Sequence, residues 1–342
     1  MGFQSQEGQI GFKTQAEEGT FADPSSDGVF VRLRSGALGA NRELLIPDPE
    51  IGGSRDIPDA YLGPVAWIGD LEFYARTRSL ATLARAAFGV AASATEGAGG
   101  AHKHTITPGV GVLPWLSIEE AIGSDFDVFH YTDAKVNTLH LEAEANGYLM
   151  GTAGMIARHQ SGGMDDGGTI VRWERTPTPP VDVGPMVVGT NIFIEWAGVT
   201  LPAKAFNFDL NNNLEDDDFR LGSLQLGDVT EMRREFTASV TVRPEDANLW
   251  RQAVYGQAGA YEAGGLVDKS EFKIICESYE LIGDTVPHSI VITAPQAILQ
   301  PFELEPSGDD VIEHEIEVQF LRPDPGVDIA TMEIVNNAEA IA

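Results

Sequence analysis

One pattern occurs twice along this chain: an alternating strand is followed directly by a short helix that ends at a glycine. Apolar and polar side chains alternate in residues 68–74, and residues 80–88 then place leucine and alanine at helical spacing before Gly89. Residues 236–242 alternate in the same way, and the helix pattern that follows ends at Gly256. The two glycines are separated by close to half of the chain, so the sequence predicts a duplicated domain.

Two hairpin patterns support this division. Residues 139–146 alternate between apolar and polar side chains, and Asn146-Gly147 is a strong signal for a tight turn between two strands. A second alternating hairpin is predicted within residues 301–321 around Gly308, which follows Gly147 at nearly the separation of the two helix-ending glycines. We therefore expect a mainly β protein, with two related β-sandwich or barrel domains in tandem and one flanking helix in each.

The domain boundaries follow from changes in composition. The first domain is expected at residues 1–174, with an N-terminal arm and a long loop at 34–64, and the second at residues 186–326. A stiff, proline-rich linker is expected at 175–185 and a C-terminal arm at 327–342. The long loop exceeds an ordinary connection within a compact domain, and its apolar residues suggest that it docks on another surface. These residues are Leu44, Leu45, Ile46 and Ile51.

The charge of the chain limits the partners that it can have. Its 52 acidic and 22 basic residues give a formal net charge of −30, which repels nucleic acid and anionic membranes. Sequence-specific DNA binding is therefore not expected, although a surface that DNA must pass without being held would have this sign. A merely solvated acidic surface is the alternative interpretation. No apolar run is long enough to span a membrane and the N-terminus is not a signal peptide pattern, so we expect a protein assembled in the cytoplasm.

The sequence contains no recognisable catalytic or metal-binding motif. Nucleophile-elbow, phosphate-loop and dinucleotide motifs are absent, and His102 and His104 lack further ligands at suitable spacing. The acidic run from Asp209 has Leu214 and Arg220 where a calcium loop needs glycine and glutamate. We therefore expect no enzyme activity, no metal and no cofactor. The single cysteine lies in an alternating run and is expected in the core.

Acidic residues alternate with apolar residues on several of the predicted strands. Two such acids on one face lie about 7 Å apart, a spacing that a glycosidase could use. A catalytic pair needs different environments to separate its pKa values, and a row of identical acids provides none. A negatively charged, solvated sheet face is therefore the favoured interpretation. The acids are Asp70, Glu72, Glu142, Glu144, Glu303, Glu305, Glu313, Glu315 and Glu317.

The order of these features resembles the tail tube (major tail) proteins of long, non-contractile-tailed bacteriophages. The resemblance is carried by the lead-in GFKTQAEEGTFADPS, the strand FVRLRS, the long loop, the helix SLATLARAAFG, and HTITPG followed by LPWLSIE and a hairpin. It covers the stretch 1–160 best, and the second half through the order of its elements. It implies a small β-sandwich or barrel with a flanking helix, assembled into rings of six domains that stack into a hollow tube.

The resemblance also implies specific roles and partners. Three copies of a duplicated chain would complete a ring, and a hexamer of copies is the alternative. The acids named above become candidates for the lumen wall, past which phage DNA moves without specific binding, and Leu44, Leu45, Ile46 and Ile51 become candidates for contacts between rings. The implied partners are further copies of the chain and the tape-measure, tail terminator and baseplate proteins, in the tail of a virion.

Two other functions stay open at this stage. A terminator or baseplate hub component would share the fold and form a single ring. A carbohydrate-binding β-sandwich module would need exposed aromatic side chains on a concave face. The five tryptophans lie mostly in apolar patterns, which favours a core location for them.

Overall fold

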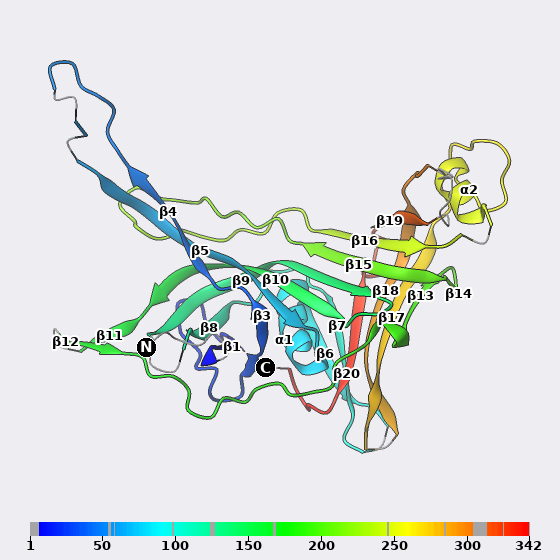
Figure 1. Cartoon of the computed structure of the whole chain (residues 1–342), viewed down its shortest axis with the longest axis horizontal. Helices are drawn as coiled ribbons and strands as arrows, with labels where there is room; N and C mark the ends of the chain where they lie inside the picture. The colour runs from blue at the N-terminus through cyan, green and yellow to red at the C-terminus, as the bar shows by residue number, and fades with distance from the viewer. Residues whose placement is uncertain are drawn as a thin grey trace.

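A computed structural model describes residues 7–53, 56–57, 59–97, 99–123, 127–166, 169–244, 246–283, 285–303, 313–323 and 325–341. Most of these residues form antiparallel β-strands, and two helices accompany them (Figure 1). The expected mainly β fold with helices is confirmed. No helix within the described ranges is long and apolar enough to cross a membrane.

The elements follow one another along the chain in two groups. The first group is β1 (Gln9–Thr14), β2 (Val29–Val31), β3 (Leu33–Ser35), β4 (Gly39–Leu45), β5 (Tyr61–Tyr74), α1 (Thr77–Phe88), β6 (Gly89–Thr95), β7 (His102–Pro108), β8 (Leu116–Ala121), β9 (Val128–Glu144), β10 (Met150–Ser161), β11 (Gly163–Asp166) and β12 (Thr169–Arg172). The second is a 3₁₀ turn (Gly189–Asn191), β13 (Ile192–Trp196), β14 (Val199–Thr200), β15 (Ala203–Asn211), β16 (Glu235–Val242), α2 (Asn248–Tyr255), β17 (Ser270–Ile282), β18 (Val286–Leu299), β19 (His314–Phe320) and β20 (Thr331–Asn336).

Strands from both groups form one continuous antiparallel sheet. Its order is β4-β5-β10-β9-β15-β16-β19, so β9 from the first half pairs directly with β15 from the second half. Apolar side chains of the six strands from β5 to β19 lie on one face of this sheet and are buried beneath it, whereas β4 is exposed. One row of this face is Phe73, Gly151, Leu141, Phe208, Ala238 and Val318. The two halves therefore share a sheet.

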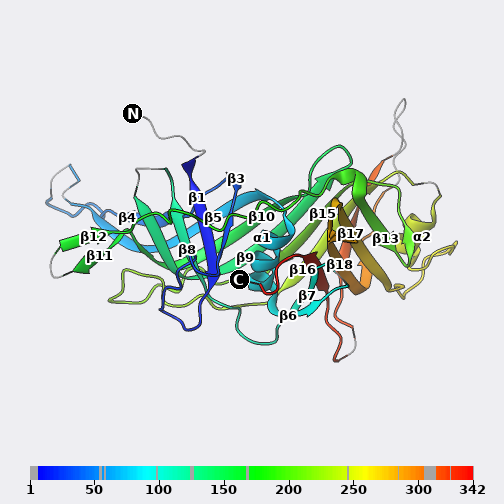
Figure 2. The ribbon, with the colours of Figure 1, turned by 90° about the horizontal axis from the view of Figure 1, so that it is seen from below.

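The remaining strands extend this sheet, except β11 and β12, which pair with each other at one end of the molecule (Figure 2). β9 also pairs with β8, which continues to β1 and β2, while β18 pairs with β17, β19 and β20. β8 includes Ser117 and Glu120, which match a helix capping box, but the β-branched and apolar residues around them favour a strand, and a strand forms.

Both ends of the described chain differ from the expected arms. Residues 9–14 form β1, in which Ile10 and Phe12 are buried. Residues 331–336 form β20, which pairs with β7 from the first half and with β18 from the second. Met332 and Ile334 of β20 are fully buried. These segments are thus structural strands, because their apolar side chains alternate and face the core.

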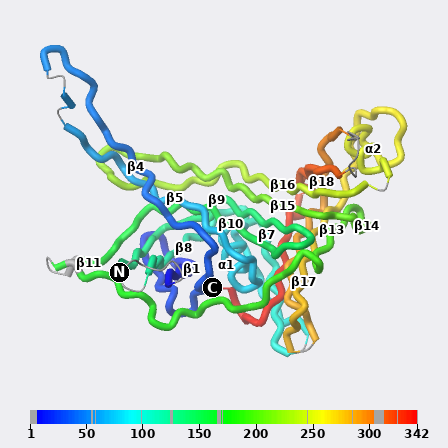
Figure 3. Tube along the Cα trace, viewed as in Figure 1, coloured from blue at the N-terminus to red at the C-terminus, as the bar shows by residue number. Residues whose placement is uncertain are grey.

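The stretch at 34–64 also differs from the expected loop. β4 pairs with β5 from Gly39–Ile68 to Leu45–Tyr61, so much of this stretch is a two-stranded hairpin. The hairpin extends far from the body of the molecule, at the upper left of Figures 1 and 3. Its frequent glycine and proline residues hid the strand pattern in the sequence.

The two helices occur at the predicted places. α1 ends at Gly89 with φ 112° and α2 at Gly256 with φ 86°, a region of backbone conformation that favours glycine. α1 begins at Thr77, so Ser79 lies within its first turn. The backbone N–H of Ser79 donates to the Oδ2 atom of the buried Asp182 over 2.7 Å.

Candidate functional site

The face of the continuous sheet that lies opposite the core is polar across all six strands from β5 to β19. It results from the strand alternation that buries the apolar residues on the other face. Hydrogen-bonded strands align its residues in rows. One row is Glu72, Thr152, His140, Asp209, Thr237 and Gln319, and the next is Tyr74, Met150, Glu142, Asn207, Ser239 and Glu317.

This polar face holds most of the acids that the sequence indicates. By strand alternation, Asp70, Glu72, Glu142, Glu144, Glu315 and Glu317 lie on it, and Glu313 precedes β19 at the same side. Glu303 is exposed after the end of β18, outside these ladders, and Glu305 lies outside the described residues.

Two further acids on this face, Asp209 and Glu235, were missed by the sequence reasoning. Asp209 lies opposite His140 and Thr237, and Glu235 lies opposite Asn211. The alternation of β15 does place Asp209 on the polar side of its strand, but its run of acids and asparagines drew the comparison with a calcium loop instead.

A histidine joins the two halves on the polar face. The Nδ1 atom of His140 lies 2.6 Å from Oδ1 of Asp209, and its Nε2 atom lies 3.6 Å from Oε2 of Glu142. The hydrogen bond to Asp209 raises the pKa of His140, against the opposing effect of partial burial. The contact with Asp209 therefore favours the protonated form of His140 at the pairing between β9 and β15.

A second cluster of charged residues lies at the β19 side of the polar face. Lys204 and Arg243 both contact the carboxylate of Glu313, with Arg243 at 2.8 Å. Hydrogen bonds from Lys204 and then Arg243 lower the pKa of Glu313. The Oγ atom of Ser239 donates to Glu315 over 2.7 Å. Glu313 is thus paired, whereas the neighbouring acids leave the face strongly negative.

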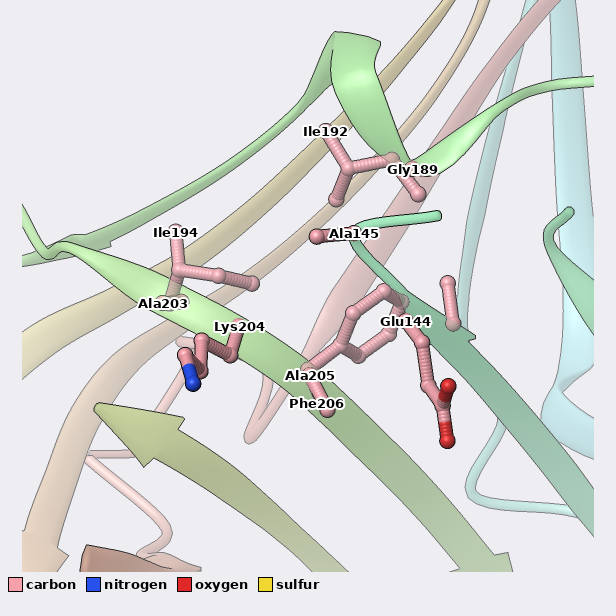
Figure 4. A pocket seen from close by; sticks show the side chains of 10 residues that line it. Glu144, Ala145, Gly189, Ile192, Ile194, Ala203, Lys204, Ala205 and Phe206 are labelled. Carbon is pink, nitrogen blue, oxygen red and sulfur yellow. The ribbon is translucent and has the colours of Figure 1, made fainter. Parts of the chain in front are cut away.

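A small pocket lies where the end of β9 meets β13 and β15 (Figure 4). Of the residues that line it, Glu144 and Lys204 carry charge, and their side chains extend toward the same side of the view. Gly189 packs so closely that a Cβ atom there would lie 2.0 Å from the backbone oxygen of Glu144. The pocket is a packing feature of this junction, without the paired carboxylates that glycoside hydrolysis uses.

The other chemical candidates of the sequence have structural roles. Both ring nitrogens of the buried His104 are engaged, Nδ1 with Ser93 at 2.8 Å and Nε2 with Asn336 at 3.0 Å. Within the part of the chain that the structure describes, no three histidine, cysteine or acidic side chains are grouped to hold a metal. Cys276 is buried, and burial raises the pKa of its thiol, as expected for an unreactive core residue.

None of the five tryptophans is exposed. Trp196 is buried, and Trp67, Trp115, Trp173 and Trp250 are half-buried. Trp115 lies under the ammonium group of Lys135, 4.0 Å from its ring centre. These side chains do not form an exposed platform on which a sugar ring could stack.

The hairpin of β4 and β5 exposes the apolar residues that the sequence indicates for docking. The exposed fractions are 57% for Leu44, 49% for Leu45, 49% for Ile46 and 108% for Ile51. Such side chains on a projecting hairpin are free to contact another molecule.

The family of the chain follows from its sequence match. Residues 5–319 match the family described as phage tail tube protein. The chain belongs to this family. The match extends through both halves, so the resemblance seen in the stretch 1–160 is confirmed for nearly the whole chain. No curated protein matches this sequence. As a member of the phage tail tube protein family, the chain is a structural component of a virion tail.

Proposed function

We propose that copies of this chain form closed rings that stack into the hollow tail tube through which the phage genome is ejected. The observation that carries this proposal is the polar face that runs without interruption across both halves of the chain. A sheet whose strands span two repeated units presents one wall, with the core behind it. This arrangement is what a self-assembling conduit requires, and no catalytic step is part of it.

The size of such a ring favours three copies. Each copy could contribute eight strands to the wall: β4, β5, β10 and β9 from the first half, and β15, β16, β19 and β18 from the second. Three copies then contribute about 24 strands, and spacing of about 4.8 Å gives a perimeter of roughly 115 Å. The corresponding backbone diameter is about 37 Å before strand tilt widens it. Six copies would give a bore about twice as wide. A trimer with pseudo-six-fold symmetry is therefore our proposal for the ring.

The acidic face is our proposal for the wall of the lumen. Duplex DNA carries a charge about every 1.7 Å along its axis, so a basic wall would hold it through many phosphate contacts. A wall that carries Asp70, Glu72, Glu142, Glu315 and Glu317 repels DNA weakly along its length and lets it move.

Successive rings need contacts that lie outside the wall. The projecting hairpin, with Leu44, Leu45, Ile46 and Ile51 exposed, is our first proposal for the contact between rings. The tube would assemble in the host cytoplasm and meet the tape-measure, tail terminator and baseplate proteins of the tail.

Electron microscopy tests the proposal directly. Purified protein at rising concentration is imaged by negative stain, and the same sample is weighed by mass photometry. We expect hollow rings or tubes with a central bore, and ring masses of three times 36.7 kDa. Single rings that never stack would indicate a terminator or hub component, and a compact dimer without a bore would contradict the conduit.

A further inference from the structure

The hairpin of β4 and β5 starts from a buried point of the chain. Residues 36–38, which we call the root of the hairpin, interrupt the pairing with β5 between the end of β3 and the start of β4. Within the root, Leu38 is 5% exposed, whereas every residue of β4 is exposed. Leu38 is therefore the last residue held in the core before the chain leaves the body of the molecule.

Side chains from β8 and β9 bond both backbone groups of Leu38. The C=O of Leu38 accepts a hydrogen bond from the hydroxyl of Tyr131 over 3.2 Å, and its N–H donates to the carboxyl group of Glu120. The Tyr131 hydroxyl oxygen also lies 2.8 Å from Oε2 of Glu120. All three residues are buried. We call Leu38, Glu120 and Tyr131 the Glu120 cluster.

The hydrogen atoms of the Glu120 cluster can be counted. The hydroxyl of Tyr131 has one hydrogen, but both Glu120 and the C=O of Leu38 lie within its reach. Gln160 of β10 also bonds this hydroxyl and lowers the pKa of Tyr131, as a donor does, so it does not compete for the hydrogen. An ionised Glu120 would take the hydrogen, because it is the closer acceptor and is charged. The C=O of Leu38 would then lose this donor.

A protonated Glu120 satisfies every group of the cluster. Its own hydrogen is donated to the hydroxyl oxygen of Tyr131, which frees the hydroxyl hydrogen for the C=O of Leu38. The carboxyl group still accepts the N–H of Leu38. Three donors and three acceptors then match in a closed ring of hydrogen bonds. Because an unpaired buried polar group is costly, the hydrogen-bond count favours the protonated acid.

The surroundings of Glu120 are uncharged. Ile10 of β1 and Phe129 of β9 lie opposite it on the two neighbouring strands. Its sequence neighbour Glu119 is bonded elsewhere, by the backbone N–H and the hydroxyl of Thr176. Among the residues that the structure describes, Tyr131 is the titratable group in contact with Glu120, and no cation forms an ion pair with it.

The pKa of Glu120 agrees with the hydrogen-bond count. Burial raises this pKa above its ordinary value of 4.5, against the opposing effect of the hydrogen bonds from Tyr131 and then Leu38. The protonated form therefore persists to a higher pH in the folded protein than in an unfolded chain.

We propose that Glu120 and Tyr131 are positioning residues for the hairpin, and that protonated Glu120 closes the hydrogen-bonded ring that holds its root. The ring ties Leu38 to β8 and β9 and so fixes the place at which β4 leaves the body. The inference rests on the proposed function in one respect, since the hairpin is there the contact between rings. One buried carboxyl group then makes the position of this contact depend on pH.

The direction of the pH dependence follows from the two states of the root. Opening of the root exposes Glu120 to water, where its ordinary pKa is 4.5. Between this value and the higher folded-state pKa, the closed root keeps a proton that the open root loses. The population of the open root therefore rises with pH, by at most about tenfold per unit, and becomes constant above the folded-state pKa.

Hydrogen exchange at the amide of Leu38 tests this on unassembled full-length protein. After correction for the intrinsic pH dependence of exchange, opening in the wild type should rise by at least about threefold between about pH 5 and pH 8. Glu120→Gln keeps a donor and an acceptor but cannot ionise, so its opening should not change with pH. Glu119→Gln is the matched control and should keep the wild-type pH dependence. A flat wild-type profile, or an equal pH dependence in Glu120→Gln, would overturn the proposal.

Two further measurements cover a variant that does not fold. Carbon-13 NMR of the Glu120 carboxyl group in wild-type protein gives its titration directly, and a midpoint at or below the ordinary pKa of 4.5 would overturn the protonated ring. Tyr131→Phe removes the hydroxyl and leaves the ring that packs against Trp67. It should speed exchange at Leu38 by about fivefold or more at low pH, and unchanged exchange would contradict the role of Tyr131.

The yield of stacked rings separates this inference from the proposed function. Tyr131→Phe should lower the share of rings that stack, and Glu120→Gln should retain it. Equal stacking in wild type and Tyr131→Phe would overturn the positioning role. Wild-type protein that forms neither rings nor tubes would contradict the proposed function, whereas exchange at Leu38 in the unassembled protein would still decide whether protonated Glu120 holds the root.

Discussion

The two halves of this chain share a strand order but differ in how they hold their helices. α1 packs against strands from both halves, and ten of its twelve residues are buried. α2 has eight residues, of which Gln252 and Ala253 are buried, and it lies at the edge of the molecule at the upper right of Figure 1. The first half of the chain is thus closed around its helix, whereas the second half leaves its helix at the periphery.

The C-terminal strand and the linker account for much of this difference. β20 adds a strand from the end of the chain beside β7, close to α1. The proline-rich linker runs along the first half, where Asp182 accepts hydrogen bonds from the backbone of Ser79 and Gly184. The linker and the C-terminal strand therefore pack against the first half. We expect the first half to resist unfolding more strongly than the second.

The largest expected difference concerns large side chains at the two helices. Phe88→Ala at the end of α1 removes a fully buried ring and should lower the free energy of unfolding by about 3–5 kcal/mol. Leu249→Ala in α2 removes a partly buried side chain and should cost about 1 kcal/mol. Urea denaturation of the unassembled protein measures both. Equal losses would show that α2 is as firmly packed as α1.

The two helix N-termini give a smaller, matched comparison. Asp182→Ala should destabilise the protein by about 2 kcal/mol, because a buried carboxylate that holds the first turn of α1 and the linker is removed. Asp246→Ala removes an exposed acceptor for the N–H of Asn248 at α2 and should cost about 0.5 kcal/mol. Thermal unfolding of the two variants decides the order, and a reversed order would contradict the role of the linker.

Local patterns predicted the two strand–helix elements well. Alternation in β5 and β16 and the glycines after both helices were visible in the sequence, and the same alternation placed Glu142 and Glu317 on one face. These features depend on residues close together in the chain. The mainly β fold and the acidic sheet face could therefore be predicted.

Features that depend on distant partners could not be predicted in this way. Asp182 caps a helix that lies far from it in the sequence, which no local pattern indicates. The strand β20 looked like a terminal arm, because its partners β7 and β18 are likewise distant along the chain. All residues of the hairpin strand β4 are exposed. Its sequence therefore lacks the alternation of apolar and polar residues that identifies a half-buried strand.

The next comparison concerns the acids contributed by each half. Asp70→Lys with Glu72→Lys changes the first half, and Glu315→Lys with Glu317→Lys changes the second. If both sets line one bore, each pair should raise the affinity of assembled tubes for short duplex DNA by about tenfold at low salt, with a steeper salt dependence. Fluorescence anisotropy at two salt concentrations measures this. The matching glutamine variants control for loss of negative charge alone, and a response from one pair only would show that the other faces elsewhere.

The smallest expected effect concerns the pairing of β9 with β15, where the two halves of the chain meet. This pairing places His140 beside Asp209. Hydrogen bonding to Asp209 raises the pKa of His140 above its ordinary value of 6.5. The added stability is therefore fully present below pH 6.5 and is lost as the pH rises through the folded-state pKa.

His140→Gln removes the contact with Asp209 as a source of charge and tests this directly. Wild-type protein should exceed the variant in unfolding free energy by less than about 1 kcal/mol at pH 6, since the pair is partly exposed, and the difference should shrink by pH 9. Burial lowers the pKa of His104, His130 and His288, so their contributions to stability have the opposite pH dependence. These histidines are present in both proteins, so their contributions cancel in the difference. A difference that grows with pH would mean that His140 is held neutral, and the charged contact would then not stabilise the pairing of β9 with β15.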